Sequence, residues 1–272
     1  MDIRNIVILT GAGVSAESGL ATFRGPDGLW EGHRVEDVCT PEAFRRDPAL
    51  VHAFYDARRA KLGTVAPNAA HQALARLDAE WPGELLLVTQ NVDDLHERAG
   101  SKRLIHMHGE LTKGWCLRCN ERFGWAGPMG EVLRDAASTS SAAPQDERDQ
   151  TTAHAEEALS EAEVPSRSTL VNICPSCGAS GMVRPDIVWF GEMPYEMERI
   201  EQALRQCDLF VSIGTSGAVY PAAGFVQTAR YCGARTLEMN LEPSLGSYMF
   251  EESRVDPAGE LVPQWVAEVL GT

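Results

Sequence analysis

The chain has no surplus of positive charge. It carries 24 Lys and Arg against 39 Asp and Glu, a formal net charge of −15 over 272 residues. Surfaces rich in phosphate attract basic proteins, so this balance argues against binding to nucleic acid or to anionic membranes. A net negative charge remains compatible with a cationic partner such as a lysine-rich tail. We therefore expect no nucleic-acid partner and no membrane partner.

Long apolar runs are missing as well. The run from Ile6 to Leu9 is too short for the core of a signal peptide, and no basic segment and cleavage site frame it. No stretch approaches the length that spans a bilayer. We expect a cytoplasmic protein, and in that compartment cysteines are more often metal ligands or free thiols than disulfides.

One segment, residues 131–168, lacks aromatic residues, isoleucine and methionine. It contains eight Ala, nine Asp or Glu and three Arg, and it contributes −6 of the net charge. Such a composition buries little apolar surface. The sequence predicts a disordered or loosely helical acidic insertion here.

Elsewhere, predicted strands alternate with predicted helices. Thr40 and Asp47 each precede a proline, the pattern of an N-cap followed by the first helical residue. Strands are expected at 5–10, 84–89, 103–108, 208–213 and 234–240, and helices after Thr40, from Asp47 to Leu62, and at 69–80, 92–100 and 261–270. This alternation predicts an α/β fold with a parallel sheet covered on both faces.

Four of the seven cysteines form two CxxC pairs, Cys116 with Cys119 and Cys174 with Cys177. Two such pairs make a tetrahedral Zn²⁺ site with no open position, so one zinc ion would be structural rather than catalytic. Redox dithiols are the alternative interpretation. The remaining cysteines have no such partners and are expected to be small buried hydrophobes.

Three turns follow predicted strands and carry glycine, hydroxyl or acidic groups. The first, residues 11–16, has the form G-x-G-x-x-A, and the others span 214–224 and 239–244. Turns at strand carboxyl ends are where open α/β sheets bind their ligands, and a glycine turn before a helix suits a pyrophosphate. A tight strand–helix turn would look similar. The acidic residue expected about 20 positions on is not evident, which disfavours an ordinary dehydrogenase.

Polar side chains follow two further strands. Gln90, Asn91 and Asp93 come after residues 84–89, and His108 ends the next strand. Imidazole is the side chain best suited to proton transfer near neutral pH. His108 is therefore our candidate general base, although a lone histidine is more often structural.

With these motifs in place, the chain resembles the sirtuins, the NAD-dependent protein lysine deacylases. The motifs occur in order along nearly the whole chain except 131–168: GAGVSAESG, TFRG, TQNVDDLH, HMHG, the two CxxC pairs, RPDIVWFGE, GTS and NLEPS. The chain is most similar to bacterial class III sirtuins, grouped with the desuccinylase and demalonylase branch, which carries T-F-R as at Thr22, Phe23 and Arg24.

The resemblance implies a Rossmann-like large domain, residues 1–35, 64–112 and 183–272, and a small domain. The small domain would combine a helical part, 36–63, with a zinc ribbon, 113–182. We expect a monomer.

The resemblance also implies roles for residues. His108 would be the base that takes a proton from the ribose after the acyl oxygen of an acylated lysine has displaced nicotinamide. The substrate peptide would add as a strand beside Val188, Phe190 and Gly191. The NAD site would consist of Gly11, Ala12, Gly13, Ser15, Glu17, Ser18, Thr22, Phe23, Arg24, Trp30, Gln90, Asn91, Asp93, Gly214, Thr215, Ser216, Asn240, Glu242 and Ala258.

Tyr55 and Arg58 match a Y-x-x-R pair of the acidic-acyl branch. An arginine fork binds a carboxylate with two hydrogen bonds, and a tyrosine hydroxyl adds a third. The alternative is a solvated surface pair. His106 stands where relatives often have Glu and is expected to be a structural strand residue, while Cys39 would narrow the acyl pocket slightly.

Two other functions stay open at this point. One is plain deacetylation or ADP-ribosyl transfer to protein. The other is a zinc-ribbon binding module that senses NAD without reaction, which the presence of His108 disfavours.

Overall fold

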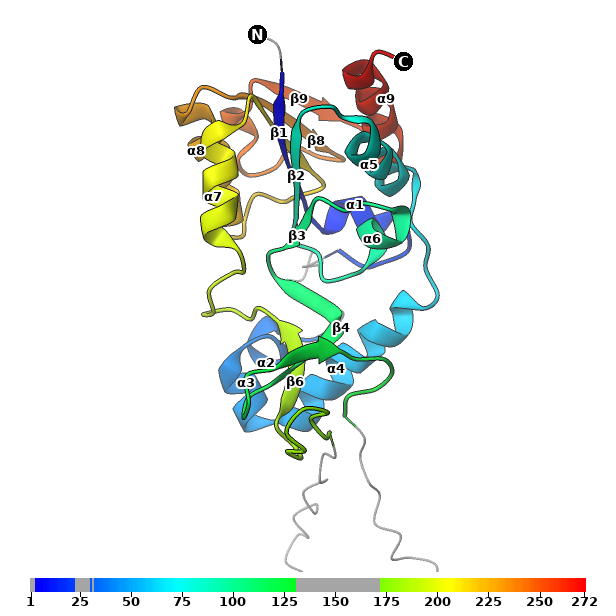
Figure 1. Cartoon of the computed structure of the whole chain (residues 1–272), viewed down its shortest axis with the longest axis vertical. Helices are drawn as coiled ribbons and strands as arrows, with labels where there is room; N and C mark the ends of the chain where they lie inside the picture. The colour runs from blue at the N-terminus through cyan, green and yellow to red at the C-terminus, as the bar shows by residue number, and fades with distance from the viewer. Residues whose placement is uncertain (1–2, 23–29, 31, 131–171) are drawn as a thin grey trace, which may run out of the picture.

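The structure is a computed structural model that describes residues 3–22, 30, 32–130 and 172–272. Within these residues the chain forms a six-stranded sheet and a three-stranded sheet (Figure 1). Phe23, Arg24 and the acidic insertion 131–168 lie outside the described residues, so the expectations for them remain predictions.

The six-stranded sheet has the order β3-β2-β1-β7-β8-β9, and all of its neighbouring strands are parallel. Its strands are β1 (Asn5–Thr10), β2 (Glu84–Thr89), β3 (Leu104–His106), β7 (Leu209–Ile213), β8 (Arg235–Asn240) and β9 (Glu252–Val255). The chain reverses its direction of strand addition after β3, and β1 and β7 become neighbours. Ligands bind at the carboxyl edge beside such a switch point. The predicted parallel α/β fold is confirmed.

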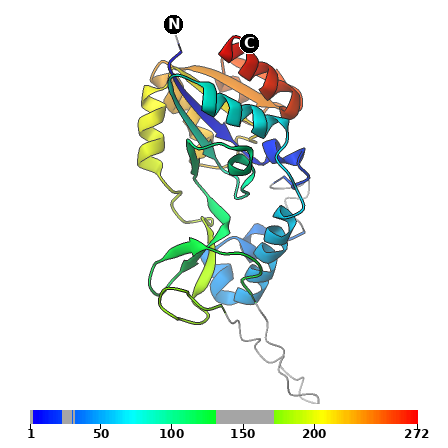
Figure 2. The same ribbon diagram turned by 45° about the vertical axis from the view of Figure 1, so that its right-hand side comes forward.

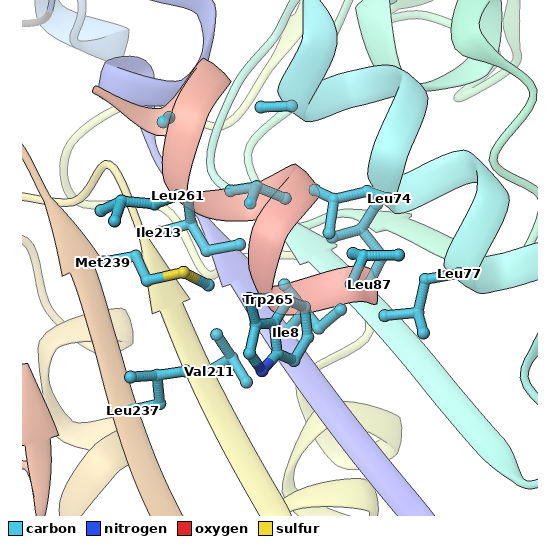
Figure 3. Packing of buried hydrophobic residues seen from close by; sticks show 14 of the residues in the cluster. Ile8, Leu74, Leu77, Leu87, Val211, Ile213, Leu237, Met239, Leu261 and Trp265 are labelled. Atoms are coloured by element: carbon cyan, nitrogen blue, oxygen red, sulfur yellow. The ribbon is translucent and has the colours of Figure 1, made fainter. Parts of the chain in front are cut away.

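Helices cover both faces of this sheet, because its central strands are apolar on both sides. One face packs against α5 (Ala69–Glu80) and α9 (Ala258–Leu270), where Trp265 fills the space beside Ile8 and Val211 (Figure 3). The other face packs against α7 (Met197–Gln206), the short η1 (Ala222–Gly224) and α8 (Phe225–Tyr231). The remaining short elements near the sheet are α1 (Ala12–Ala16), α6 (Leu95–Ala99) and η2 (Ser247–Met249).

A second layer of structure lies beyond the carboxyl edge of the sheet, at the opposite end of the molecule from both termini (Figures 1 and 2). It contains α2 (Val35–Val38), α3 (Pro41–Arg46) and α4 (Pro48–Leu62). The predicted caps are present: Thr40 Oγ1 accepts from the N–H of Ala43, and Asp47 Oδ1 accepts from that of Leu50. The buried face of α4 packs on β4 and β6 around Trp189.

The three-stranded sheet has the order β5-β4-β6 and is antiparallel. Its strands are β4 (Gly109–Cys116), β5 (Arg122–Gly124) and β6 (Val183–Ile187). The strand expected at 103–108 is shorter, because β3 ends at His106 and β4 begins at Gly109. Gly109 has a φ of +82°, and a Cβ there would lie 2.0 Å from the carbonyl oxygen of Asp186. The chain therefore turns at this glycine from one sheet into the other.

Other element boundaries differ from expectation by a few residues. The helix α6 starts at Leu95 rather than at 92, and α9 starts at Ala258 rather than at 261. The edge strand β9 was not predicted, because its side chains are mostly exposed and show no apolar alternation. No helix in the described ranges combines the length and the apolar character of a membrane span.

Candidate active site

A cavity of about 470 Å³ lies between the carboxyl edge of the large sheet and the helical layer. Groups from both sheets and from α4 line it. The predicted site residues on its wall are Gly11, Ala12, Gly13, Ser15, Thr22, Trp30, Arg58, Gln90, Asn91, Asp93, His108, Val188, Phe190, Gly191, Gly214, Thr215, Ser216, Asn240 and Glu242.

Two glycine turns interlock on one wall of this cavity. The N–H of Gly13 donates to the carbonyl of Gly214 at 2.9 Å, and the N–H of Gly11 donates to that of Ile213 at 3.0 Å. A Cβ on Gly13 would lie 2.7 Å from the Cα of Gly214, which itself has a φ of +63°. The close approach leaves backbone, rather than side chains, facing the cavity, as a pyrophosphate site requires.

Asn240 organises the second glycine turn. Its Oδ1 accepts from the N–H of Thr215 at 2.9 Å, and its Nδ2 donates to the Thr215 carbonyl at 3.0 Å and to Glu238 at 3.1 Å. The Asn240 side chain, which we expected in the NAD site, is thus already engaged in holding the turn. Glu242, two residues on, also lines the cavity.

A buried polar network lies under the cavity between α1 and the loop after β2. The Ser15 hydroxyl donates to Asp93 Oδ2 at 3.0 Å and accepts from Asn91 Nδ2 at 3.1 Å. Burial raises the pKa of Asp93, although the N–H of Leu95 and the Ser15 hydroxyl oppose that shift. The network fixes the amide and the carboxylate relative to one another at the cavity wall.

His108 reaches the same wall from the turn between β3 and β4. Its Nδ1 is 3.2 Å from the carbonyl oxygen of Gln90, so a proton on Nδ1 donates there and Nε2 keeps its lone pair. Burial lowers the pKa of His108, with the Gln90 contact opposing it. The imidazole is therefore neutral at physiological pH, which is the form that a general base needs.

Arg58 lies at the far end of the cavity, on α4. Its guanidinium carbon is 3.1 Å from the ring centroid of Phe54 and 4.7 Å from that of Trp30, and its Nη1 donates to the Phe54 carbonyl at 2.6 Å. The side chain is mostly buried yet contributes to the cavity wall. A buried cation beside aromatic faces is an attractive site for a carboxylate.

Tyr55 is placed differently from Arg58. Its side chain is fully buried and is not part of the cavity wall. The hydroxyl accepts from Trp189 Nε1 at 3.0 Å and donates to Cys39 Sγ at 3.3 Å. Cys39 and Trp189 do line the cavity, so Tyr55 lies directly behind that wall.

Three residues that we predicted for the NAD site, and that the structure describes, do not line the cavity: Glu17, Ser18 and Ala258. Glu17 Oε1 accepts from the N–H of Gly259 at 2.8 Å, at the start of α9. Sequence reasoning also missed several wall residues. Helical spacing could have found Lys61, which is three positions after Arg58 on α4. Among the others, four lie in loops that have no periodic pattern: Val92, Val219, Tyr220 and Leu241.

The four predicted zinc ligands converge in the small sheet. Their sulfur atoms all lie within 4.8 Å of one another, and the Cys116–Cys177 and Cys119–Cys174 pairs are 3.8 and 3.7 Å apart. A tetrahedron of zinc–sulfur bonds of about 2.3 Å has edges of about 3.8 Å, so the donor set fits one structural zinc.

Comparison with known proteins defines the class. Residues 11–221 match the Sir2 family, and the chain belongs to that family. A Bdellovibrio bacteriovorus protein named NAD-dependent protein deacylase is 51% identical, over 99% of this chain and 100% of that protein.

Solved structures agree with this assignment. A Sir2 homolog–NAD complex is 34% identical with a TM-score of 0.77, covering 98% of this chain and 90% of that chain. A structure described as Sir2–p53 peptide–NAD⁺ is 26% identical with a TM-score of 0.70, covering 99% of this chain and 95% of that chain.

Proposed function

We propose that this protein is an NAD-dependent protein lysine deacylase that prefers acidic acyl groups, succinyl and malonyl, and also accepts acetyl. The observation that carries the proposal is that one cavity joins interlocked glycine turns, a neutral, half-buried His108 and the guanidinium of Arg58. The naming of the bacterial relative and the NAD complex of the solved homologue support the reaction class.

The cofactor end suits a dinucleotide. The turns at Gly11–Gly13 and Gly214–Ser216 offer backbone to the pyrophosphate, and Asn91 and Asp93 offer an amide and a carboxylate to the nicotinamide and its ribose. When bound, NAD supplies the ribose carbon that accepts the acyl oxygen and the nicotinamide that leaves. One water molecule is consumed in releasing the amine, and the products are the free lysine, nicotinamide and O-acyl-ADP-ribose.

His108 acts as the base in this scheme. The Gln90 carbonyl holds its Nδ1 proton, so Nε2 is the atom that receives the proton of the ribose hydroxyl. Bound NAD and acyl-lysine would fill the cavity and keep competing water from the ribose carbon before nicotinamide leaves.

The substrate peptide would lie along residues 188–191. This segment is already held on one side, since the N–H of Val188 donates to the His108 carbonyl at 2.9 Å and that of Phe190 to the Cys39 carbonyl at 3.1 Å. An extended peptide beside it would lead the acyl-lysine towards His108. Beyond the reacting carbonyl, the acyl chain would point to Arg58, which binds the distal carboxylate.

The proposal also divides the chain into a large domain, residues 1–35, 64–112 and 183–272, and a small domain, residues 36–63 and 113–182. The two sheets share no strand, which supports the division. Strands β4 and β6 pair with one another in the three-stranded sheet, so we move the two proposed boundaries at residues 112 and 183 to about residues 108 and 188 and assign residues 109–112 and 183–187 to the small domain. The proposal places the protein in the cytoplasm as a monomer, without nucleic-acid or membrane partners.

The decisive experiment compares matched peptides carrying acetyl-, malonyl- and succinyl-lysine, with ¹⁴C-labelled NAD and mass spectrometric detection of products. We expect O-acyl-ADP-ribose from all three and the highest kcat/KM for the acidic acyl groups. Label transferred to protein would indicate an ADP-ribosyltransferase. Equal or better turnover of acetyl-lysine would indicate a plain deacetylase, and NAD binding without nicotinamide release would indicate a sensor.

A further inference from the structure

His106 makes a bridge that sequence reasoning did not anticipate. It is the last residue of β3, and its side chain is 7% exposed. Its Nδ1 lies 3.1 Å from the carbonyl oxygen of Asn91, and its Nε2 lies 2.5 Å from Glu97 Oε1 on α6. Both acceptors are oxygens that cannot donate when Glu97 is ionised, so both contacts are satisfied only if each ring nitrogen carries a proton.

His106 and His108 form a parallel pair. Each places Nδ1 against a backbone carbonyl of the same loop, His106 against Asn91 and His108 against Gln90. The two histidines differ in the environment of their Nε2 atoms. His108 presents that atom to the cavity, whereas His106 does not line the cavity and presents it to a carboxylate.

The charges around His106 favour its protonated form. Burial by itself would lower the pKa of His106, but Glu97, the Asn91 carbonyl and Glu110 outweigh it and raise the pKa. The other titratable groups that face it are the buried Asp93, the neutral His96 of α6, and Lys113 of β4, which pairs with Glu110 at 2.5 Å.

We propose that His106, as an imidazolium bridging Asn91 and Glu97, is a positioning residue that holds the Asn91–Asp93 loop in its NAD-binding geometry. The inference rests on the proposed function of this site. Asn91 connects the bridge to the cofactor wall, because its backbone carbonyl is held by His106 while its side chain donates to Ser15 in the network under the cavity.

Loss of the second proton would break the bridge. A neutral ring with its proton on Nδ1 turns a lone pair towards Glu97, and one with its proton on Nε2 turns a lone pair towards the Asn91 carbonyl. Because the folded-state pKa is raised, the bridge is intact at low pH and is lost as pH rises through that value. We therefore expect the KM for NAD to increase on the alkaline side.

Two isosteric substitutions separate the halves of the bridge. In His106→Asn the amide nitrogen takes the place of Nδ1 and keeps the bond to Asn91, while in His106→Gln it takes the place of Nε2 and keeps only the bond to Glu97. Loss of one charge-assisted hydrogen bond corresponds to about a tenfold change in binding affinity. We expect His106→Gln to raise the KM for NAD about tenfold with little change in kcat, and His106→Asn to stay within about threefold of wild type.

Glu97→Gln tests the charge directly. A glutamine amide can donate to a neutral Nε2, so the variant keeps a bridge without the second proton on the ring and should lose the alkaline rise in KM. Asp94→Asn is the matched control, since it removes a carboxylate at the start of the same helix that pairs with Arg98 rather than with His106. Its pH profile should equal that of wild type.

The proposal stands on two results. His106→Asn should bind NAD more tightly than His106→Gln, and Glu97→Gln, unlike Asp94→Asn, should lose the rise in the KM for NAD at alkaline pH. Equal impairment of both His106 variants, or an unchanged rise in Glu97→Gln, would overturn the proposal and leave His106 a purely structural residue. NMR titration of the His106 ring gives a readout free of turnover, and a ring pKa at or below the ordinary value of about 6.5 would also overturn it. If wild type releases no nicotinamide at all, the proposed function fails while this titration still reports on the bridge.

Discussion

The two ends of the cavity are built from different chemistry. At the sheet end, the wall is backbone and hydrogen-bonded polar groups, with Gly13 packed on Gly214 and Ser15 joined to Asp93. At the α4 end, the wall is aromatic and carries the buried guanidinium of Arg58. The sheet end can hold a ligand by fixed geometry, whereas the α4 end can only distinguish among ligands by charge and size.

Because the two ends differ in this way, mutations at each end should have different effects on the kinetics. A change at the sheet end should affect every acyl substrate equally, because all share NAD and the reacting carbonyl. A change at the α4 end should alter the kcat/KM of one acyl group relative to another and leave the reaction itself intact. Substitutions at the two ends, and removal of the zinc, test that separation.

Removal of the zinc should abolish deacylation of all substrates. Structural zinc contributes about 10–16 kcal/mol in small modules, comparable with the whole stability of a domain. Cys174→Ala should unfold the three-stranded sheet and loosen α4, whose Asp56 accepts the N–H groups of Met129 and Gly130. The sheet end should still give a thermal shift with NAD.

Zinc content, near-ultraviolet circular dichroism and activity would be measured together. Cys232→Ala is the matched control, because Cys232 lies outside the cluster and is exposed, contrary to the expectation that it would be buried. A metal-free protein with unchanged melting temperature and activity would refute a structural zinc.

Substitution of His108 should cause the next largest loss. A general base contributes about 10²- to 10⁴-fold, so His108→Tyr should lower kcat by that order for acetyl and succinyl peptides alike. Zinc content and fold should be unchanged. Because burial lowers the pKa of His108, wild-type kcat/KM should fall only below the ordinary histidine value of about 6.5, as the base becomes protonated. A fall in kcat/KM that is centred above about pH 6.5 would contradict the assignment of His108 as the base.

Arg58→Met should separate the two ends most clearly. A charge-assisted hydrogen bond contributes about 1.5–3 kcal/mol, which corresponds to about a 10- to 150-fold loss in kcat/KM for succinyl-lysine. Most of it should appear in KM, since the carboxylate lies away from the reacting carbonyl. Acetyl-lysine should change little. Arg45→Met on the exposed side of α3 is the control, and equal losses on both substrates would make Arg58 structural.

Tyr55→Phe should have the smallest kinetic effect. Its hydroxyl bonds Trp189 and Cys39 inside the wall, so its removal leaves a buried indole N–H without this acceptor. We expect a loss of stability of about 1–3 kcal/mol, seen in urea unfolding, with succinyl kcat/KM reduced only a few-fold. A loss as large as that of Arg58→Met, with unchanged stability, would show that the hydroxyl reaches the acyl carboxylate directly.

The sequence predicted the parts of the molecule whose residue type is dictated by local chemistry. The apolar strands, the caps at Thr40 and Asp47 and the cysteine pairs are of this kind, and the sulfur spacing confirms the cluster. The bridge at His106 and the burial of Tyr55 depend on which groups from distant elements meet them. No local pattern specifies Glu97 or Trp189 as a partner, because those contacts arise only when α6 and residues 188–191 are packed.

The contact between Gly13 and Gly214 has an evolutionary consequence. A Cβ on either residue would meet backbone of the other loop: on Gly13 it would lie 2.7 Å from the Cα of Gly214, and on Gly214 it would lie 2.4 Å from the backbone nitrogen of Val14. Single steps away from glycine are therefore closed from either direction. The two loops must diversify together or not at all, and grafting one of them into a distant homologue would succeed only if the other is transplanted with it.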